Sequence, residues 1–279
     1  MEIVPLSKTE DGHLEMQASI NGITATFVLD TGATGTVIDT NKLSVFGIST
    51  KQDKIVGLRI GDAQTGKIET FTLDIKQFSI GQKQLKINSI YTNDSSGQFE
   101  PQVMGLIGYD ALTELGAMLD VKNLRLLIPE DQNDIKEWLS KTTKNYETIL
   151  MHKSALGFSL VDAQLGNNLV SLLVDTGTPE LIFDETALTQ FGFELVNHPK
   201  AKSVIAQGVE LPMKVLKNGQ IILGSRTLSD DFFTTDFSAL MSAVNVTDKR
   251  RLIGILGNKH LAAMNAIIDV TNGKLYIGD

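Results

Sequence analysis

The stretch Phe-Val-Leu-Asp-Thr-Gly at residues 27–32 has a counterpart at residues 172–177, where the sequence is Leu-Leu-Val-Asp-Thr-Gly. Each copy places an acid, a hydroxyl and a glycine directly after an apolar run that is typical of a strand. By chance, a given tripeptide is expected only roughly a few times in a hundred chains of this length. Two copies in matching contexts therefore indicate that Asp30 and Asp175 are held rigidly in turns and brought face to face.

The duplication extends beyond these tripeptides. Asp30 and Asp175 lie 145 positions apart, and two later Gly-apolar-apolar-Gly units, 105–108 and 254–257, lie 149 positions apart. The offset changes by only a few residues, as small loop insertions would cause. The chain is therefore predicted to be one structural unit written twice.

Most secondary-structure signals are those of strands. Short apolar or alternating runs such as Ile23–Leu29 and Leu169–Val174 are bounded by Gly, Asn or Asp. Short helices are predicted after each Gly-apolar-apolar-Gly unit, at Tyr109–Leu115 and Asn258–Met264. The clearest helix covers Asp131–Lys144, with acids early and lysines late. It is expected to connect an N-terminal lobe, residues 1–144 including this helix, to a C-terminal lobe, residues 145–279.

Composition narrows the function classes. The hydrophobic fraction of 42% is ordinary for a globular protein, and the net charge of −8 disfavours nucleic acid or an anionic membrane as a partner. No window approaches the length of a membrane span, so no membrane insertion is expected. There are no cysteines, and the histidines show no ligand spacing, so neither a metal nor a cofactor is predicted.

In both halves, the apolar run into Asp-Thr-Gly is followed, after a long β segment, by an apolar-apolar-Gly unit. This pattern resembles the aspartic peptidase superfamily of pepsins and retropepsins over nearly the whole chain. The resemblance implies a mainly β fold of two similar closed-barrel lobes related by a pseudo-two-fold axis, with short helices. Asp30-Thr31-Gly32-Ala33 and Leu106-Ile107-Gly108 are similar to the retropepsin style, which suggests a two-lobe bacterial retropepsin-like protein.

The expected chemistry follows from the paired acids. Two carboxylates a few ångströms apart cannot both ionise cheaply, so they hold one proton between them. The ionised member takes a proton from a bound water while the protonated member hydrogen-bonds the scissile carbonyl. Asp30 and Asp175 are thus the expected catalytic residues of an aspartic endopeptidase that cuts an extended polypeptide between the lobes. A monomer suffices for this activity, and pepstatin-like inhibitors are expected ligands.

The neighbouring residues have expected supporting roles. The glycines let the backbone present N–H groups to the carboxylates, and the resemblance implies that the threonines hydrogen-bond across the lobe interface. The later units are expected to pack beneath both loops and keep them oriented. The full supporting set comprises Thr31, Gly32, Ile107, Gly108, Thr176, Gly177, Thr178, Leu256 and Gly257.

The two halves differ one residue after the motif. The Thr178 hydroxyl could donate to Asp175, whereas Ala33 is expected to offer nothing to Asp30. A carboxylate that lacks a hydrogen-bond donor has a raised pKa, because its charged form is less well stabilised. The acid limb of the pH–activity profile is therefore expected at higher pH than it would be if both aspartates had such a donor.

Two hairpins are candidates to cover the substrate, at Val56–Lys67 and Ile205–Met213.

Other interpretations stay open. A non-catalytic peptide-binding or regulatory module could keep the same fold, although retention of both acids and both threonines favours an enzyme. Two carboxylates could also clamp a divalent cation, but the additional ligands of such a site are missing. Compartment is undetermined: export is expected if a leader has been trimmed, and a cytoplasmic location otherwise.

Overall fold

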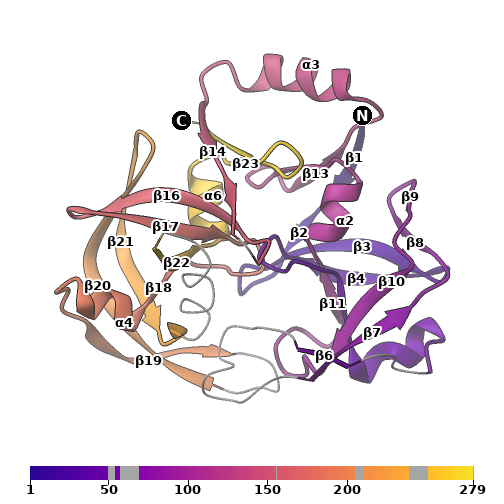
Figure 1. Cartoon of the computed structure of the whole chain (residues 1–279), viewed down its shortest axis with the longest axis horizontal. Coiled ribbons are helices and arrows are strands. Elements are labelled where there is room, and N and C mark those ends of the chain that lie inside the picture. The colour runs from indigo at the N-terminus through magenta and orange to yellow at the C-terminus, as the bar shows by residue number, and fades with distance from the viewer. Residues whose placement is uncertain (50–53, 57–68, 155, 205–209, 239–250, 279) are drawn as a thin grey trace.

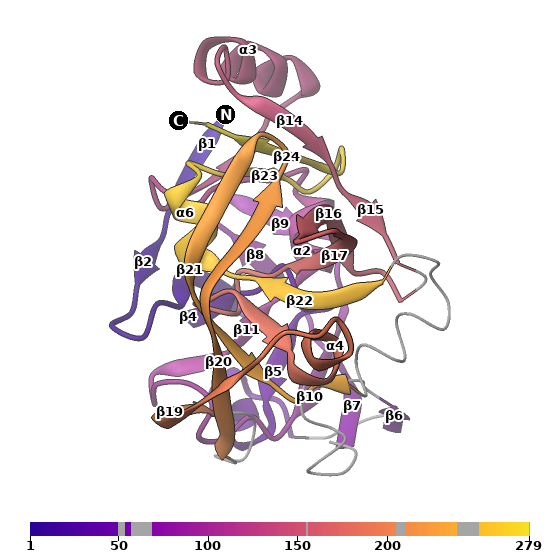
Figure 2. The same cartoon turned by 90° about the vertical axis from the view of Figure 1, so that its left-hand side faces the viewer.

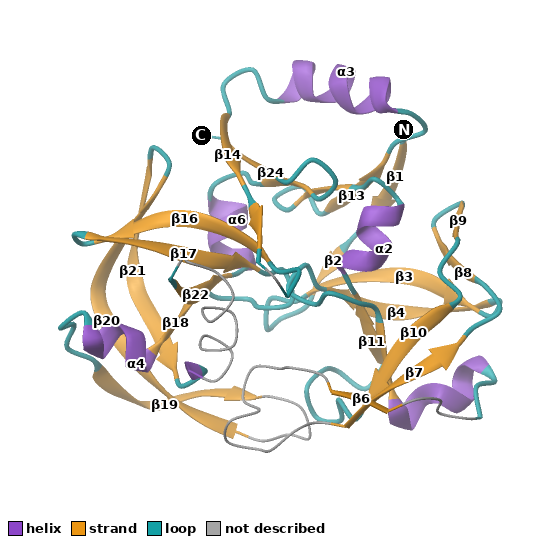
Figure 3. Cartoon of the chain, viewed as in Figure 1, coloured by secondary structure: helices purple, strands orange, loops and turns teal. Residues whose placement is uncertain are grey.

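The computed structural model describes residues 1–49, 54–56, 69–154, 156–204, 210–238 and 251–278, and the described strands form three sheets (Figure 1). Strands dominate and the helices are short (Figure 3), which confirms the predicted mainly β fold. Within these described ranges the helical segments are η1 (Thr40–Phe46), α2 (Tyr109–Glu114), α3 (Gln132–Thr142), α4 (Glu185–Gln190) and α6 (Asn258–Ala263).

The first sheet forms what we call the N-terminal lobe. Its strands run in the order β6 (Lys54–Val56), β7 (Glu69–Asp74), β10 (Ser89–Asn93), β5 (Val37–Asp39), β11 (Val103–Ile107), β4 (Ile23–Leu29), β3 (Leu14–Ile20), β8 (Phe78–Ile80) and β9 (Lys83–Leu85), with β2 (Ser7–Lys8) paired to β3. The predicted strand at residues 23–29 is therefore present with the predicted bounds.

The second sheet forms the C-terminal lobe. Its order is β15 (His152–Lys153), β16 (Ser159–Leu165), β17 (Asn168–Val174), β22 (Leu252–Leu256), β18 (Ile182–Asp184), β21 (Arg226–Thr235), β20 (Glu210–Leu223) and β19 (Val196–Val204). Because β20 also pairs with β16, this sheet closes into a barrel of the strands β16, β17, β22, β18, β21 and β20. In the N-terminal lobe the counterpart of β20 is divided, since β7 pairs with β10 while β8 pairs with β3.

The third sheet joins the two lobes. It consists of β1 (Glu2–Pro5), β13 (Arg125–Ile128), β12 (Met118–Asp120), β23 (Ile267–Asp269), β24 (Lys274–Ile277) and β14 (Glu147–Leu150). At its centre β12 and β23 are antiparallel, with Leu119 opposite Ile268, and these residues are equivalent in the two halves. This pairing places a pseudo-two-fold axis between the lobes (Figures 1 and 2).

The predicted connector helix is α3, which is capped by the Asp131 side chain and packs over the third sheet (Figure 1). Its Ile135, with the partly buried Trp138 and Leu139 beside it, contacts an apolar cluster that includes Met118 and Tyr276. The predicted helices after the two glycine units are α2 and α6, whose ends differ by one residue from those expected.

The same strand arrangement positions each motif aspartate. In the N-terminal lobe β11 is parallel to β4 and antiparallel to β5, and in the C-terminal lobe β22 is parallel to β17 and antiparallel to β18. Asp30 follows β4 and Asp175 follows β17, so both leave the sheet beside the end of a parallel strand. The two motif loops therefore have matching environments in the two lobes.

Candidate active site

Asp30 and Asp175 are held by the strands beside them. The N–H of Asp30 donates to the carbonyl of Ile107 at 3.0 Å, and the N–H of Asp175 donates to the carbonyl of Leu256 at 3.2 Å. The side chains of Ile107 and Leu256 are fully buried in the hydrophobic core. Each aspartate is thus fixed at its backbone by a strand that is itself anchored in the core.

Both carboxyl groups accept hydrogen bonds from their own loops. Oδ1 of Asp30 accepts from the N–H groups of Gly32 at 2.8 Å and Ala33 at 2.9 Å. Oδ1 of Asp175 accepts from the N–H of Gly177 at 2.7 Å, and its Oδ2 accepts from the Thr178 hydroxyl at 2.8 Å. The expectation that Ala33 offers nothing to Asp30 was wrong for the backbone, because the N–H of a residue is available whatever its side chain.

The two carboxyl groups lie against one another. A Cβ atom added to Gly32 would lie 2.4 Å from Cγ of Asp175, and one added to Gly177 would lie 2.5 Å from Cγ of Asp30. Burial and the neighbouring Asp175 carboxyl raise the pKa of Asp30 well above its usual value. This proximity makes a shared proton the expected state of the pair.

Two threonines tie the motif loops together across the lobes. The hydroxyl of Thr31 accepts from the N–H of Thr176 and donates to the carbonyl of Val174. The hydroxyl of Thr176 accepts from the N–H of Thr31 and donates to the carbonyl of Leu29. These four bonds are 2.8–3.1 Å long and both threonines are buried, so the relative position of the two loops is strongly constrained.

The later glycines sit beneath the motif loops. A Cβ on Gly108 would lie 2.4 Å from the carbonyl carbon of Gly35, and one on Gly257 would lie 2.2 Å from the carbonyl oxygen of Glu180. Both contacts are with backbone atoms, which cannot rotate away as a side chain can. Only a glycine therefore lets the loop after each aspartate approach this closely.

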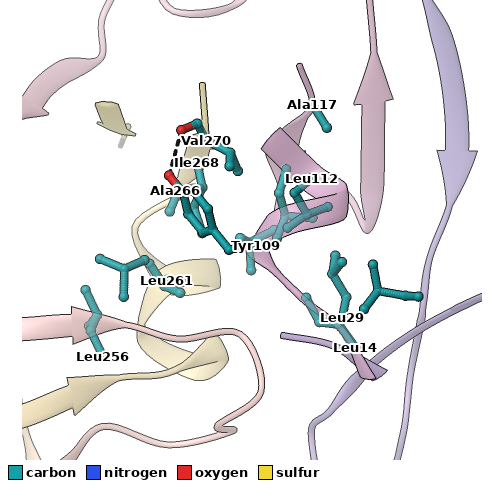
Figure 4. Packing of buried hydrophobic residues seen from close by; sticks show 14 of the residues in the cluster. Leu14, Leu29, Tyr109, Leu112, Ala117, Leu256, Leu261, Ala266, Ile268 and Val270 are labelled. Atoms are coloured by element: carbon teal, nitrogen blue, oxygen red, sulfur yellow. Dashed lines mark hydrogen bonds between the residues drawn. The ribbon is translucent and has the colours of Figure 1, made fainter. Parts of the chain in front are cut away.

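Sequence reasoning missed Tyr109 and Asn258, which directly follow those glycines. The Tyr109 hydroxyl donates to the carbonyl of Val270 in the other half of the chain at 2.6 Å (Figure 4), and the Lys153 ammonium lies 2.9 Å from its ring centroid. The Asn258 amide donates to the carbonyl of Thr176 at 2.6 Å. The sequence did contain a signal for these residues. Both occupy the position after the glycine in their half of the repeat, and a polar side chain at both equivalent positions indicates that each makes a structural hydrogen bond.

Most of both hairpin candidates lies outside the described residues. The first, Val56–Lys67, is described only at Val56, the end of β6. The second, Ile205–Met213, is described from residue 210 onward, in β20. Within the described ranges, no group of three or more acidic or histidine side chains is placed to hold a metal ion. The helices seen there also lack the length and apolar character needed to cross a membrane.

Gly32→Ala is expected to reduce kcat/KM by about a hundredfold or more, because the new methyl group would push the Asp175 carboxyl out of alignment. Peptide hydrolysis and circular dichroism measured together would check this. Gly22→Ala is the control, because its added Cβ meets no atom within 4 Å, so the strain of its positive φ of 83° should lower stability and leave activity unchanged. Equal activity of Gly32→Ala and wild type would contradict the described packing of the two loops.

Comparison with known proteins relates the fold of this chain to that of aspartic proteases. A family model described as an aspartyl protease matches residues 16–111, which include Asp30 and its loop. The solved aspartic proteinase from Irpex lacteus is similar in structure, with a TM-score of 0.57 and 13% identity, and the match covers 99% of this chain and 96% of that one. No curated protein matches by sequence. The family match and the pepsin-like fold together support membership of this chain in the aspartic peptidase superfamily.

Proposed function

We propose that the protein is an aspartic endopeptidase that hydrolyses peptide bonds of an extended polypeptide between its two lobes. The single observation that carries the proposal is that the Asp30 and Asp175 carboxyl groups are neighbours, each held by its own loop and lying against the motif glycine of the other. A protein that only binds peptides has no need of two acids in this arrangement. An extended substrate would lie across both loops, as peptides that bind by backbone pairing do.

The hydrogen bonds hold both acids in position for the reaction without fixing which of them carries the proton. Asp30 accepts from two backbone N–H groups of its loop. Asp175 accepts from one backbone N–H and from the Thr178 hydroxyl. The ionised member of the pair accepts a proton from water, and the protonated member donates a hydrogen bond to the scissile carbonyl. Water attacks the carbonyl carbon, and proton transfer to the amide nitrogen releases the amine.

The test is cleavage of a mixed-peptide library by the wild-type protein, alone, with pepstatin and with EDTA. An aspartic endopeptidase should yield internal cleavages that pepstatin reduces and EDTA leaves unchanged. Peptide binding without cleavage would favour the regulatory module instead. Cleavage abolished by EDTA would favour a cation held by the two carboxylates.

Hydroxyl groups that donate to Asp30 or Asp175 should set the pH at which the acid limb of the pH–rate profile falls. Thr178→Val removes the hydroxyl donor to Asp175, which makes protonation of the ionised carboxyl easier, so the acid limb should move up by about one pH unit. Ala33→Ser adds a donor beside Asp30 and should move the acid limb down. Profiles of kcat/KM against pH for the three proteins check both directions, and unchanged limbs would refute the role of these donors.

A further inference from the structure

Strand pairing places Glu15 in a row of residues that crosses the N-terminal sheet. Glu15 lies opposite Val28, Val28 opposite Leu106, and Leu106 opposite Val37, on the adjacent strands β3, β4, β11 and β5. Directly paired residues of neighbouring strands point to the same face of a sheet. These four side chains therefore share one face.

The face that carries this row also carries the Asp30 carboxyl. Val28 precedes Asp30 by two residues, and side chains two apart on a strand point to the same side. Strand spacing and rise place Glu15 roughly 8 Å from Asp30, measured between backbones. A lysine or arginine beside the scissile bond can span that distance with its long stem.

In the C-terminal lobe the four equivalent positions are all apolar, and the row continues to His152 as that of Glu15 continues to Ser7. Leu160 lies opposite Leu173, Leu173 opposite Ile255, and Ile255 opposite Ile182. These residues form a hydrophobic cluster with Phe237 and Leu252. Glu15 is thus the one charged residue among the eight, at a position where the other lobe has a leucine.

Glu15 is buried without a neutralising partner. Only 9% of its surface is exposed, and among the described residues its Oε1 atom has no hydrogen-bond partner. Burial and the nearby Asp11 and Glu100 carboxylates raise the pKa of Glu15, while His13 lowers it. The Nδ1 atom of His13 is paired with Asp11 at 3.0 Å rather than with Glu15. Ionising a buried carboxyl group in this setting is costly unless a cation approaches it.

We propose that Glu15 receives the basic side chain of a substrate lysine or arginine that lies next to the scissile bond. This inference rests on the proposed endopeptidase function and names its substrate class. The charge pair would form only when substrate is bound, which explains why the free protein leaves the carboxylate unpaired.

The test compares matched peptides that differ only in lysine, arginine, glutamine or leucine at each position flanking the scissile bond. The wild type should prefer a basic residue at one such position. Glu15→Gln keeps the shape and removes the charge, so kcat/KM for the basic peptide should fall by about a hundredfold, with little change for the leucine peptide. Glu15→Leu copies the residue of the other lobe, and should reverse the preference and melt at no lower temperature than wild type.

Glu100→Gln is the control, because it removes a neighbouring exposed carboxylate and should leave the preference in place. Cleavage without a charge preference, or a preference that survives Glu15→Gln, would overturn this inference and leave the endopeptidase intact. A Glu15→Leu protein that is less stable than wild type would indicate a structural role for the carboxylate and would also count against the inference. Failure of the wild type to cut any peptide would overturn the proposed function itself.

Discussion

Asp30→Asn is expected to lose about 10⁴-fold in kcat/KM and to gain stability at neutral pH. The activity falls because an amide cannot exchange a proton with water or with Asp175. The stability rises because the substitution removes a carboxyl group whose ionisation is opposed by burial and by its charged neighbour. Asp175→Asn should lose activity to a similar extent, since neither acid can work alone.

The pH dependence of the stability gain follows from linkage. The folded-state pKa of Asp30 lies above its unfolded value, so between these two values the folded protein binds more protons than the unfolded chain. Wild-type stability therefore falls as the pH rises through this window, which begins at about pH 4. The asparagine side chain of Asp30→Asn does not titrate, so the gain of the variant should be absent at lower pH and grow above it.

Denaturant unfolding of both proteins at several pH values checks this expectation, with peptide hydrolysis measured in parallel. Asp39→Asn is the matched control, because Asp39 is a buried aspartate of the same lobe. Its side chain caps η1 by accepting a hydrogen bond from the N–H of Asn41, and the side-chain oxygen of an asparagine can accept the same bond. That variant should keep its activity. An Asp30→Asn protein that retains substantial turnover would rule out the paired-acid mechanism.

Thr31→Val should destabilise the protein by about 3 kcal/mol and lower kcat by about tenfold or more. The substitution is nearly isosteric, but it leaves the N–H of Thr176 and the carbonyl of Val174 buried without partners. Each such loss costs about 1–3 kcal/mol, and the total corresponds to a decrease in Tm of roughly 6–12 °C. Thermal unfolding and steady-state kinetics measure the two effects.

Two variants separate the cross-lobe bonds from ordinary packing. Thr31→Ser retains the hydroxyl and should restore most of the activity. Thr92→Val removes a buried hydroxyl that bonds to Ile38 within one lobe, so it should lower stability and leave kcat unchanged. If Thr31→Val affected stability alone, as Thr92→Val should, the threonines would not be positioning the catalytic loops.

Much of the fold and of the site could be predicted because the chain repeats its own motif. The Asp-Thr-Gly units and the later glycines identify loops whose local geometry depends on few residue types, so sequence alone is informative there. The division of one long strand into β7 and β8 could not be predicted, because it depends on pairing with strands distant in sequence. The N–H of Ala33 was missed because side-chain identity says nothing about backbone donors.

Glu15 shows the same limit more clearly. The alternation at residues 14–20 puts Glu15, Gln17 and Ser19 on one face of β3, which the sequence pattern alone would assign to solvent. Gln17 is exposed as that pattern predicts, but Glu15 is buried. Its burial is a property of the tertiary structure, in which β3 pairs with β2, β4 and β8, and no local pattern encodes it.

A pH titration of aspartate carboxyl groups by carbon-13 NMR most directly tests whether Asp30 and Asp175 share one proton. Wild-type protein should show one carboxyl that stays protonated well above the usual aspartate range, and the same signal should be missing from Asp30→Asn. If every aspartate of the folded wild-type protein ionised in the usual range, the two acids would not share a proton and the proposed mechanism would be wrong.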